Sequence, residues 1–348
     1  MKKNFDVKIS FSIMTILIIL VGIFQSWGVA LSILNLCLIS AVMSMGVNIQ
    51  WGFAGLINFG VMGFLAIGGL ATVLVSVPPV YEAWAVGGSG ILISAIFLVS
   101  VIVCVYLINA KIPYYKYKNH LIFLIIIISI PLLKFISGPA IGRIESVNAA
   151  TLGFLGGANL PIIFSWFVGG ILSAVVAFII GKICLGLRSD YLAISTLLIS
   201  GIVITIVKHE EWLSRGVKNV IGLKRPAPYE TNLQKNDLFI NAVEFFNTSK
   251  LSSIIDLEAR ASLLNQLVIT SSGIFVKLCF SLIFLFVVLT LLYLSEKALN
   301  SPWGRMMRAI RDNETAANAM GKDVVKQHLI IFVIGAAIVG VAGAMLVT

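Results

Sequence analysis

Long apolar runs limit what this chain can fold into more strictly than any other feature of its sequence. Eight runs of about 17 to 25 residues, the length at which a helix crosses a bilayer, are separated by polar stretches. They lie at about 9–26, 29–49, 53–77, 90–109, 120–137, 161–182, 191–207 and 273–295, and a ninth begins at 329. Lipid offers the backbone no hydrogen-bonding partner, so each run is expected to be helical. The sequence predicts an all-α polytopic membrane protein with about eight to nine transmembrane helices.

Basic residues fall unevenly on the two sides of these runs. If the amino terminus is cytoplasmic, fourteen of the 25 lie on the cytoplasmic side: Lys2, Lys3, Lys8, Lys111, Lys116, Lys118, Lys182, Arg188, Lys297, Arg305, Arg308, Arg311, Lys322 and Lys326. Eight more lie in a long polar loop at 208–272, and such loops cross the membrane largely regardless of charge. The placement of the basic residues therefore predicts a membrane orientation, and it argues against a nucleic-acid partner despite the net charge of +10. The amino terminus and residues 298–328 are expected in the cytoplasm, and 208–272 in the periplasm.

Several kinds of chemistry are missing. None of the 15 carboxylates lies inside an apolar run, whereas a proton-coupled carrier needs an intramembrane relay. His120, His209 and His328 lie at loops or boundaries and are interpreted as solvated. The sequence has no phosphate-binding loop, and its four cysteines all lie in apolar runs, so neither a disulfide framework nor a metal site is indicated. We expect no enzyme activity, cofactor or metal, and a transport protein of this kind would need a partner to supply energy.

The one strongly polar stretch between two apolar runs is 301–328, here called the polar segment. Ser301 followed by Pro302 predicts a helix start. Asp312 or Asn313 can cap a second short helix, which Gly321 can end in a left-handed conformation, and Asp323 can cap the next apolar helix. Two interpretations are about equally supported by these features: a connector resting on anionic lipid headgroups, or a docking element.

The amino-acid sequence of this segment favours the interpretation as a docking element. GRMMRAIRDNETAANAMG resembles the cytoplasmic coupling segment of membrane subunits in ATP-binding-cassette importers for branched-chain amino acids, although Thr315 separates the acidic residue from the paired alanines. By that resemblance, the residues expected to contact an ATPase are Gly304, Arg305, Arg308, Ala309, Arg311, Asp312, Glu314, Ala317 and Gly321.

Two further stretches resemble the same family. The glycine-rich run at 46–69 matches its early segment, and LRSDYLAISTLLISGIV at 187–203 matches a second motif. The residues expected to line or support a translocation path are Asn48, Gly52, Gly55, Asn58, Gly60, Asp190 and Thr196. From the residues alone, close helix packing and a pore-lining role are about equally supported for the glycines. Glycine also permits a helix to break where it lines a cavity. Asp190 is expected to cap its helix, and Thr196 fits a hydroxyl bonded to the carbonyl four residues back somewhat better than a substrate contact. Downstream, Arg215 stands where the family commonly has a second glycine.

The resemblance implies one permease domain over 1–348, of the second, LivM-like type, in the bacterial inner membrane. The partners it implies are a second permease subunit, two ATP-binding-cassette ATPase subunits and a periplasmic binding protein, besides membrane lipid. Branched-chain amino acids are the favoured cargo, and urea, other amides or sugars are the alternatives; an autonomous carrier is the competing class. Residues 225–272 are expected either to contact an external partner or to form a surface cap. The chain stops at Thr348 inside an apolar run, so it either ends at the far face or is truncated.

Overall fold

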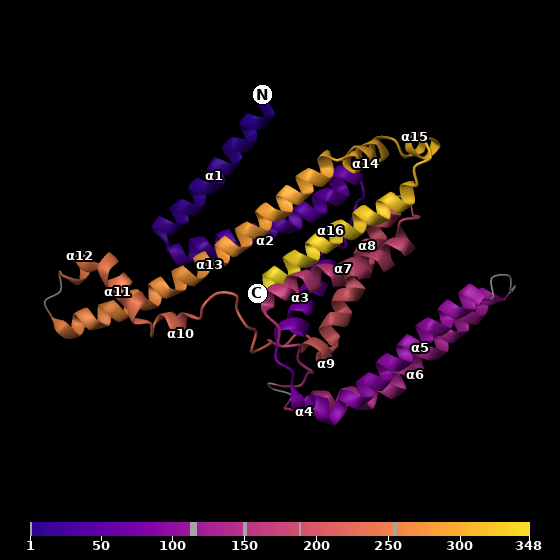
Figure 1. Cartoon of the computed structure of the whole chain (residues 1–348), viewed down its shortest axis with the longest axis horizontal. Helices are drawn as coiled ribbons and strands as arrows, with labels where there is room; N and C mark the ends of the chain where they lie inside the picture. The colour runs from indigo at the N-terminus through magenta and orange to yellow at the C-terminus, as the bar shows by residue number, and fades with distance from the viewer. Residues whose placement is uncertain (1, 112–116, 149–151, 188, 253–255) are drawn as a thin grey trace. The chain divides into compact units, whose positions relative to one another are not determined.

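The structure, a computed structural model, describes residues 2–111, 117–148, 152–187, 189–252 and 256–348, and all regular structure in these ranges is helical. The elements (Figure 1) are α1 (Lys2–Phe24), α2 (Trp27–Asn48), the π-helical turn η1 (Ile49–Phe53), α3 (Val61–Ser76), α4 (Tyr81–Ala83), the π-helical turn η2 (Trp84–Gly88), α5 (Ser89–Lys111), α6 (Lys118–Ser146), α7 (Ile162–Cys184), α8 (Ser189–His209), α9 (Glu211–Ser214), α10 (Glu230–Leu233), α11 (Asp237–Phe246), α12 (Thr248–Leu251), α13 (Leu257–Asn300), α14 (Pro302–Asp312), α15 (Glu314–Ala319) and α16 (Val324–Val347).

The membrane-spanning character of the chain is confirmed. Within the described residues, seven helices are long and apolar enough to cross a membrane, and 8–24 and Val61–Ser76 form shorter apolar helices. Each of the nine expected runs therefore coincides with a helix. The run expected at 53–77 is wrong in its first part, because residues 55–60 are not helical and α3 begins only at Val61.

The run expected at 120–137 is too short, because α6 continues to Ser146 through Pro131 and Pro139. A proline inside a helix removes one backbone hydrogen bond and costs about 3 kcal/mol in water. In a membrane-spanning helix this cost is tolerated, because local adjustments and neighbouring groups satisfy the freed carbonyl. The apolar sequence thus overrides two local helix-breaking signals.

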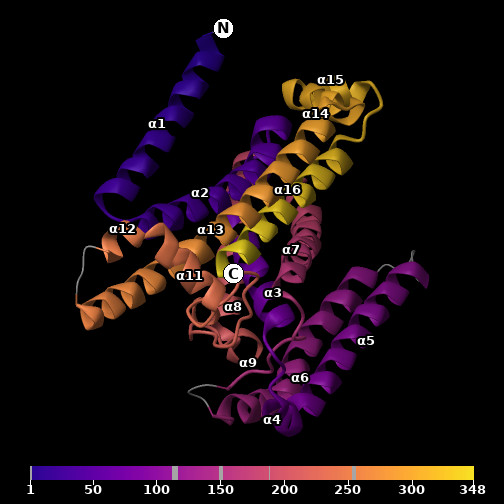
Figure 2. The same cartoon turned by 60° about the vertical axis from the view of Figure 1, so that its left-hand side comes forward.

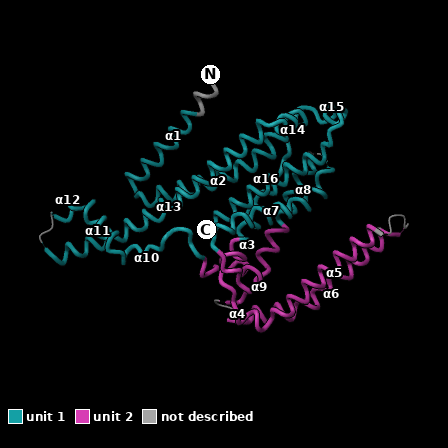
Figure 3. The backbone as a smooth tube through the Cα atoms, viewed as in Figure 1, with its two compact units in different colours: residues 1–71, 161–201, 224–348 teal, residues 72–160, 202–223 magenta. Residues whose placement is uncertain are grey.

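Two compact units make up the chain, and they are drawn in different colours in Figure 3: residues 1–71, 161–201 and 224–348, and residues 72–160 and 202–223. The first unit is organised around α16, the most buried spanning helix among the described residues. It packs against α7 and α2, and α2 also packs along α13, as the turned view in Figure 2 shows. Ile331, Phe332 and Ala336 on α16 are fully buried in this core.

Glycines let the helices of the first unit approach closely. A Cβ at Gly46 on α2 would lie 2.6 Å from the Gly335 carbonyl oxygen on α16, and one at Gly68 on α3 would overlap the Gly340 carbonyl. Small residues are the usual means by which helices pack in lipid, where no hydrophobic effect draws them together. Close packing, one of the two explanations considered for the glycine-rich run, therefore applies at these positions.

The second unit is built on the pairing of α5 with α6. A small core of Ala83, Ile144 and Leu155 closes one end of this pair. Arg215, expected to replace a glycine, has φ of 63° and is buried, with its guanidinium 5.8 Å from the centroid of the Phe154 ring. The left-handed conformation favours glycine, so the glycine expected at this point would fit the backbone without strain.

Residues 208–272, expected to form a long loop, contain four short helices in their described part and also the first part of α13. The expected surface helix DLFINAVEFF is α11. It lies along α13, with the Phe239 and Phe275 ring centroids 5.9 Å apart. Asp256 caps the second expected helix, which continues without interruption into the apolar span, so that α13 has 44 residues.

Candidate functional site

The end of α2 is a built helix break. After η1, the amide of Gly55 donates to the Trp51 carbonyl and that of Leu56 to the Gln50 carbonyl, each at 3.0 Å. Gly55 has φ of 73°, and this pattern is the usual glycine-closed helix end. The chain then runs non-helically through 55–60, here called the break, before α3 begins. Single π-helical turns are frequent at functional sites, and non-helical backbone at membrane depth occurs only where protein or a cavity surrounds it.

Two buried amide side chains hold the break. The Gln50 side-chain Nε2 donates to the Phe332 carbonyl oxygen on α16 at 2.8 Å. The Asn58 Nδ2 donates to the Gln50 Oε1 at 2.8 Å, and the Asn58 Oδ1 accepts from the Gly60 amide at 2.8 Å. Gln50 is 1% exposed and Asn58 8%, so each of these groups would be costly to leave unpaired. This network joins η1, the break and α16, and we call it the buried amide network.

Thr196 attaches α8 to the same break. Its hydroxyl donates to the Ala193 carbonyl at 2.9 Å and accepts from the Phe59 amide at 3.2 Å. A bond from this hydroxyl to a carbonyl of its own helix was expected and is present, but it goes to the carbonyl three residues back instead of four. Gly60 belongs to this contact as well, because a Cβ there would lie 2.7 Å from the Thr196 carbonyl oxygen. The hydroxyl of Thr196 therefore fixes the break to α8.

Asp190 does not lie with these residues. It is an exposed residue in the first turn of α8, which begins at Ser189, so the expectation that it caps this helix is wrong. A cap must precede the first helical residue, and the preceding Arg188 lies outside the described residues. Asp190 is also absent from the linings of the two hollows described next.

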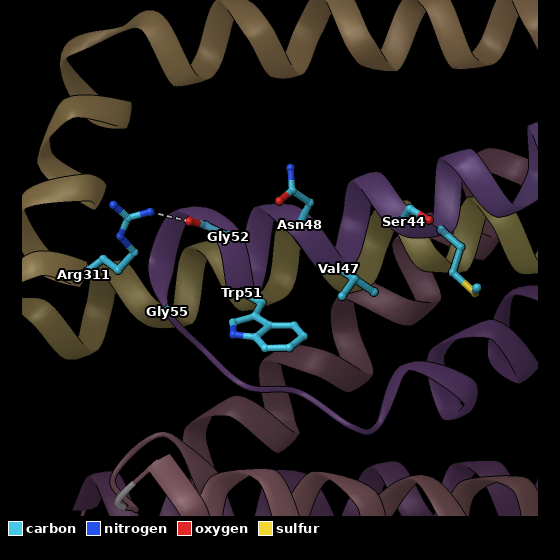
Figure 4. A pocket seen from close by; sticks show the side chains of 8 residues that line it. Ser44, Val47, Asn48, Trp51, Gly52, Gly55 and Arg311 are labelled. Atoms are coloured by element: carbon cyan, nitrogen blue, oxygen red, sulfur yellow. Dashed lines mark hydrogen bonds between the residues drawn. The ribbon is translucent and has the colours of Figure 1, made fainter. Parts of the chain in front are cut away.

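Two hollows open beside the end of α2. One, of about 570 Å³, is lined by Met43, Ser44, Val47, Asn48, Trp51, Gly52, Gly55 and Arg311 (Figure 4). The other, of about 510 Å³, lies between α2, η1, α13 and α14 and is lined by Met45, Asn48, Ile49, Phe53, Leu292, Ser295, Glu296, Leu299, Asn300 and Arg308. Asn48 contributes to both hollows, and Figure 4 shows its side chain and that of Trp51 pointing to different sides of the helix. The linings are mainly apolar with a few polar groups, as in sites for small molecules.

The first half of the polar segment is α14, as expected. The Ser301 Oγ accepts from the Gly304 amide at 3.4 Å, and Met307 and Ile310 are fully buried. Gly304 has a steric role, because a Cβ there would overlap the Leu299 carbonyl. The exposed outer face of α14 includes Ala309.

The three arginines of α14 are exposed, yet each also bonds within the chain. Arg305 donates to the Asn300 carbonyl at 3.4 Å and Arg308 to the Leu299 carbonyl at 3.3 Å. Basic side chains at these positions stabilise the unpaired carbonyls at the end of α13. Arg311 reaches further: its Nη1 donates to the Gly52 carbonyl oxygen in η1 at 2.6 Å, the bond drawn as a dashed line in Figure 4. It also pairs with Asp312 at 3.0 Å.

The second half of the polar segment is α15. Asn313, one of the two expected caps, accepts from the Ala316 amide at 2.9 Å, Gly321 has φ of 75°, and Asp323 caps α16 by accepting from the Lys326 amide at 2.9 Å. No residue of α15 is buried, although Ala317 packs partly against the core. The face of α15 is therefore left open.

His328 does not fit its expected role. It was expected to be solvated, but it is 6% exposed, because α16 enters the core within two turns of its start. Its Nε2 lies 3.9 Å from the Glu314 carboxylate of α15. One residue earlier, the Gln327 Oε1 accepts from the Trp303 Nε1 at 3.2 Å. The start of α16 thus meets both helices of the polar segment.

Comparison with known proteins identifies the family. A family model described as "Branched-chain amino acid transport system / permease component" matches residues 29–348. The chain belongs to this permease family. A relative in Methanocaldococcus jannaschii, a "Probable branched-chain amino acid transport permease protein LivM", is 38% identical over 66 residues, which are 19% of each chain. The chain thus matches about a fifth of the length of this relative. No solved structure matches the chain.

Sequence reasoning missed two polar residues of this permease. Gln50 lies within the glycine-rich run, and a glutamine inside an apolar run was itself a signal, because such side chains hydrogen-bond between helices. Lys277 on α13 donates to the Gly28 carbonyl at 3.0 Å, and the neighbouring Ser281 donates to Asn35 at 2.6 Å. These bonds join α13 to α2. A basic residue inside an apolar run is a signal of the same kind.

Proposed function

We propose that this permease is a membrane subunit of an ATP-driven importer for branched-chain amino acids. It would stand in the bacterial inner membrane with its amino terminus in the cytoplasm, beside a second permease subunit. Two ATPase subunits would bind on the cytoplasmic side, and a periplasmic binding protein would deliver the substrate. The family description and the name of the archaeal relative support the cargo. No phosphate-binding loop is present in the sequence, so hydrolysis is assigned to the partners.

One observation supports the ATPase contact: the polar segment presents an open face and is bonded to η1, directly before the break. α15 has no buried residue, and α14 buries one face while exposing Ala309 and the arginines. Arg311 meets the η1 backbone directly. A lipid-resting connector would instead turn apolar residues outwards, whereas the large apolar side chains Met307 and Ile310 of α14 face the core. A protein partner on the open face would thus act on the break through Arg311.

The cargo follows from the groups around the break. The polar side chains there are the neutral amides of Gln50 and Asn58 and the hydroxyl of Thr196. The hollow that Gln50 and Asn58 line, of about 210 Å³, is otherwise lined by Val47, Trp51, Leu56, Ile57, Phe59 and Val61 and is mainly apolar. A zwitterion with an aliphatic side chain fits such surroundings better than a strongly charged solute, which would need a counter-charge. Leucine, isoleucine and valine are the substrates we assign.

The decisive experiment adds a charge to the open face without removing a bond. Ala309→Glu places a carboxylate on exposed α14, where glutamate is a good helix former, and Ala261→Glu makes the same change on exposed α13 as a matched control. We expect Ala309→Glu to weaken ATPase copurification by at least about tenfold, because an unpaired charge in an interface costs more than 1.4 kcal/mol. ATP-dependent leucine uptake should fall with it, and Ala261→Glu should change neither.

Two results would contradict the proposal. Normal ATPase copurification by Ala309→Glu would favour the lipid-resting connector. ATP-dependent transport of a sugar, with no amino acid or amide moved by the wild-type complex, would refute the cargo.

A further inference from the structure

We infer that Gln50 is a positioning residue through which movement of the polar segment reaches the break. This inference rests on the proposed function and adds a residue to it. Gln50 lines a hollow of about 210 Å³ together with Asn58, but it is 1% exposed and its amide is bonded within the chain at both ends, so we assign it the role of connecting structural elements. What distinguishes it is that both ends of one side-chain amide are used: Oε1 holds the break through Asn58, and Nε2 holds α16 through the Phe332 carbonyl.

The polar segment contacts both η1 and α16, the two helices that Gln50 connects. On one side, Arg311 donates to the Gly52 carbonyl, two residues beyond Gln50 in η1. On the other side, Trp303 bonds to Gln327 and Glu314 approaches His328 at the start of α16. Phe332 follows His328 by one helical turn. A shift of α14 and α15 against the core therefore pulls on η1 and on α16 at once, and Gln50 is the side-chain bond between them.

The packing around Gln50 requires a flat, hydrogen-bonding side chain. A Cβ at Gly335 on α16 would overlap the Gln50 Cγ and lie 2.7 Å from its Nε2, so the amide rests directly on the α16 backbone. An apolar residue of similar length could fill the space, but it would leave the Asn58 amide without its acceptor. An unsatisfied buried donor costs more than the bond itself contributes. The break would then be released from α16 while the helices stay packed.

This arrangement predicts uncoupling. If Gln50 transmits movement, its loss leaves ATPase binding and hydrolysis in place and lowers the amount of substrate moved per ATP. If Gln50 only stabilises the fold, transport and hydrolysis decline together as the amount of folded complex declines. The ratio of transport to hydrolysis is therefore the quantity that separates the two roles.

The test uses the complete complex, with both permease subunits, the ATPases and the binding protein, reconstituted in vesicles, and measures leucine moved per ATP hydrolysed. Gln50→Leu removes both of its bonds, and Asn58→Leu removes the bonds to Gln50 and from the Gly60 amide while it leaves the Gln50 bond to α16 in place. Ser173→Ala is the matched control, because it deletes another buried side-chain bond of the same core, the 3.0 Å bond from Ser173 Oγ to the Phe64 carbonyl. The thermal stability of each complex is measured in parallel.

We expect Gln50→Leu to lower the ratio by about tenfold with ATPase copurification unchanged, as loss of one buried hydrogen-bonded connection would do. Asn58→Leu should lower it similarly, and the double variant should be no worse than either, since both act on one connection. Ser173→Ala should lose stability and keep the ratio. Gln50→Glu, which keeps an acceptor for Asn58, should restore part of it.

Each alternative result overturns something definite. An unchanged ratio in Gln50→Leu overturns the inference about Gln50, and so does an equal loss of ratio in Ser173→Ala. Absence of ATP-dependent leucine transport by the wild-type complex overturns the proposed function and this inference with it.

Discussion

A single methyl group at Gly46 tests how tightly α2 and α16 are held together. The Cβ of Gly46→Ala would lie 2.6 Å from the Gly335 carbonyl oxygen and 2.9 Å from the Val339 Cγ2. The first obstacle is backbone and cannot rotate away, so the helices must separate by about 0.8 Å to reach the 3.4 Å of ordinary contact. The same movement would stretch the 2.8 Å bond from Gln50 to the Phe332 carbonyl to about 3.6 Å, beyond hydrogen-bonding distance.

The energetic cost follows from these distances. Inserting a methyl group into a packed core typically costs about 1–3 kcal/mol, and the lost hydrogen bond adds about 1 kcal/mol. Replacing glycine by alanine in a helix also stabilises the helix by about 1 kcal/mol through propensity alone. Gly273→Ala on α13 serves as the control for this gain, because a Cβ there meets nothing within 4 Å.

The assay is unfolding of the purified permease in detergent, followed by tryptophan fluorescence. We expect Gly46→Ala to be less stable than Gly273→Ala by about 2–4 kcal/mol, the sum of the packing and hydrogen-bond losses. Equal stability of the two variants would refute the close approach of α2 and α16, and with it the argument that Gln50 bridges them.

Two further predictions concern the polar segment. Asn313→Ala removes the cap of α15 and should destabilise that helix by about 1 kcal/mol, which raises the rate of amide hydrogen exchange in 314–320 by roughly fivefold. The free energy of global unfolding should not change, because α15 buries no residue. An unchanged exchange rate would contradict the capping bond. In a variant whose native cysteines are replaced, an impermeant thiol reagent applied to intact cells should label Leu238→Cys and label Met320→Cys only after lysis. Both positions are about 80% exposed, so labelling of Met320→Cys in intact cells would reverse the proposed orientation.

Local signals in the sequence predicted local structure well. Ser301, Asn313 and Asp323 cap the helices expected of them, and Gly321 is left-handed as expected. Each of these features depends on residues within one helical turn, where side-chain chemistry acts directly on the neighbouring backbone. The spans were predicted for a similar reason, because bilayer thickness sets their length.

Features that depend on distant parts of the chain were not predictable in this way. Gln50 bonds to a carbonyl 282 positions away, and nothing near residue 50 specifies that partner. His328 looks like a boundary residue in the sequence, yet it is buried, because α16 enters the core near its start and α15 packs beside it. Asp190 was predicted as the cap of α8 but lies two positions after the cap position, and the assigned ends of helices commonly differ by one or two residues. The candidate site was thus predicted as a region, but its connections became visible only in three dimensions.

α13 is a single long helix that connects distant parts of the first unit. Its 44 residues extend for about 66 Å at 1.5 Å per residue, about twice the thickness of the hydrocarbon layer. α10 and α11 pack on this helix, and α14 follows it directly at Ser301. The helix continues without a break through Gly273, and if it moves as a rigid rod, a tilt of about 5° about one end displaces the other end by about 6 Å, roughly the length of one helical turn. A rigid α13 would therefore carry a movement at its contacts with α10 and α11 to α14 at its other end.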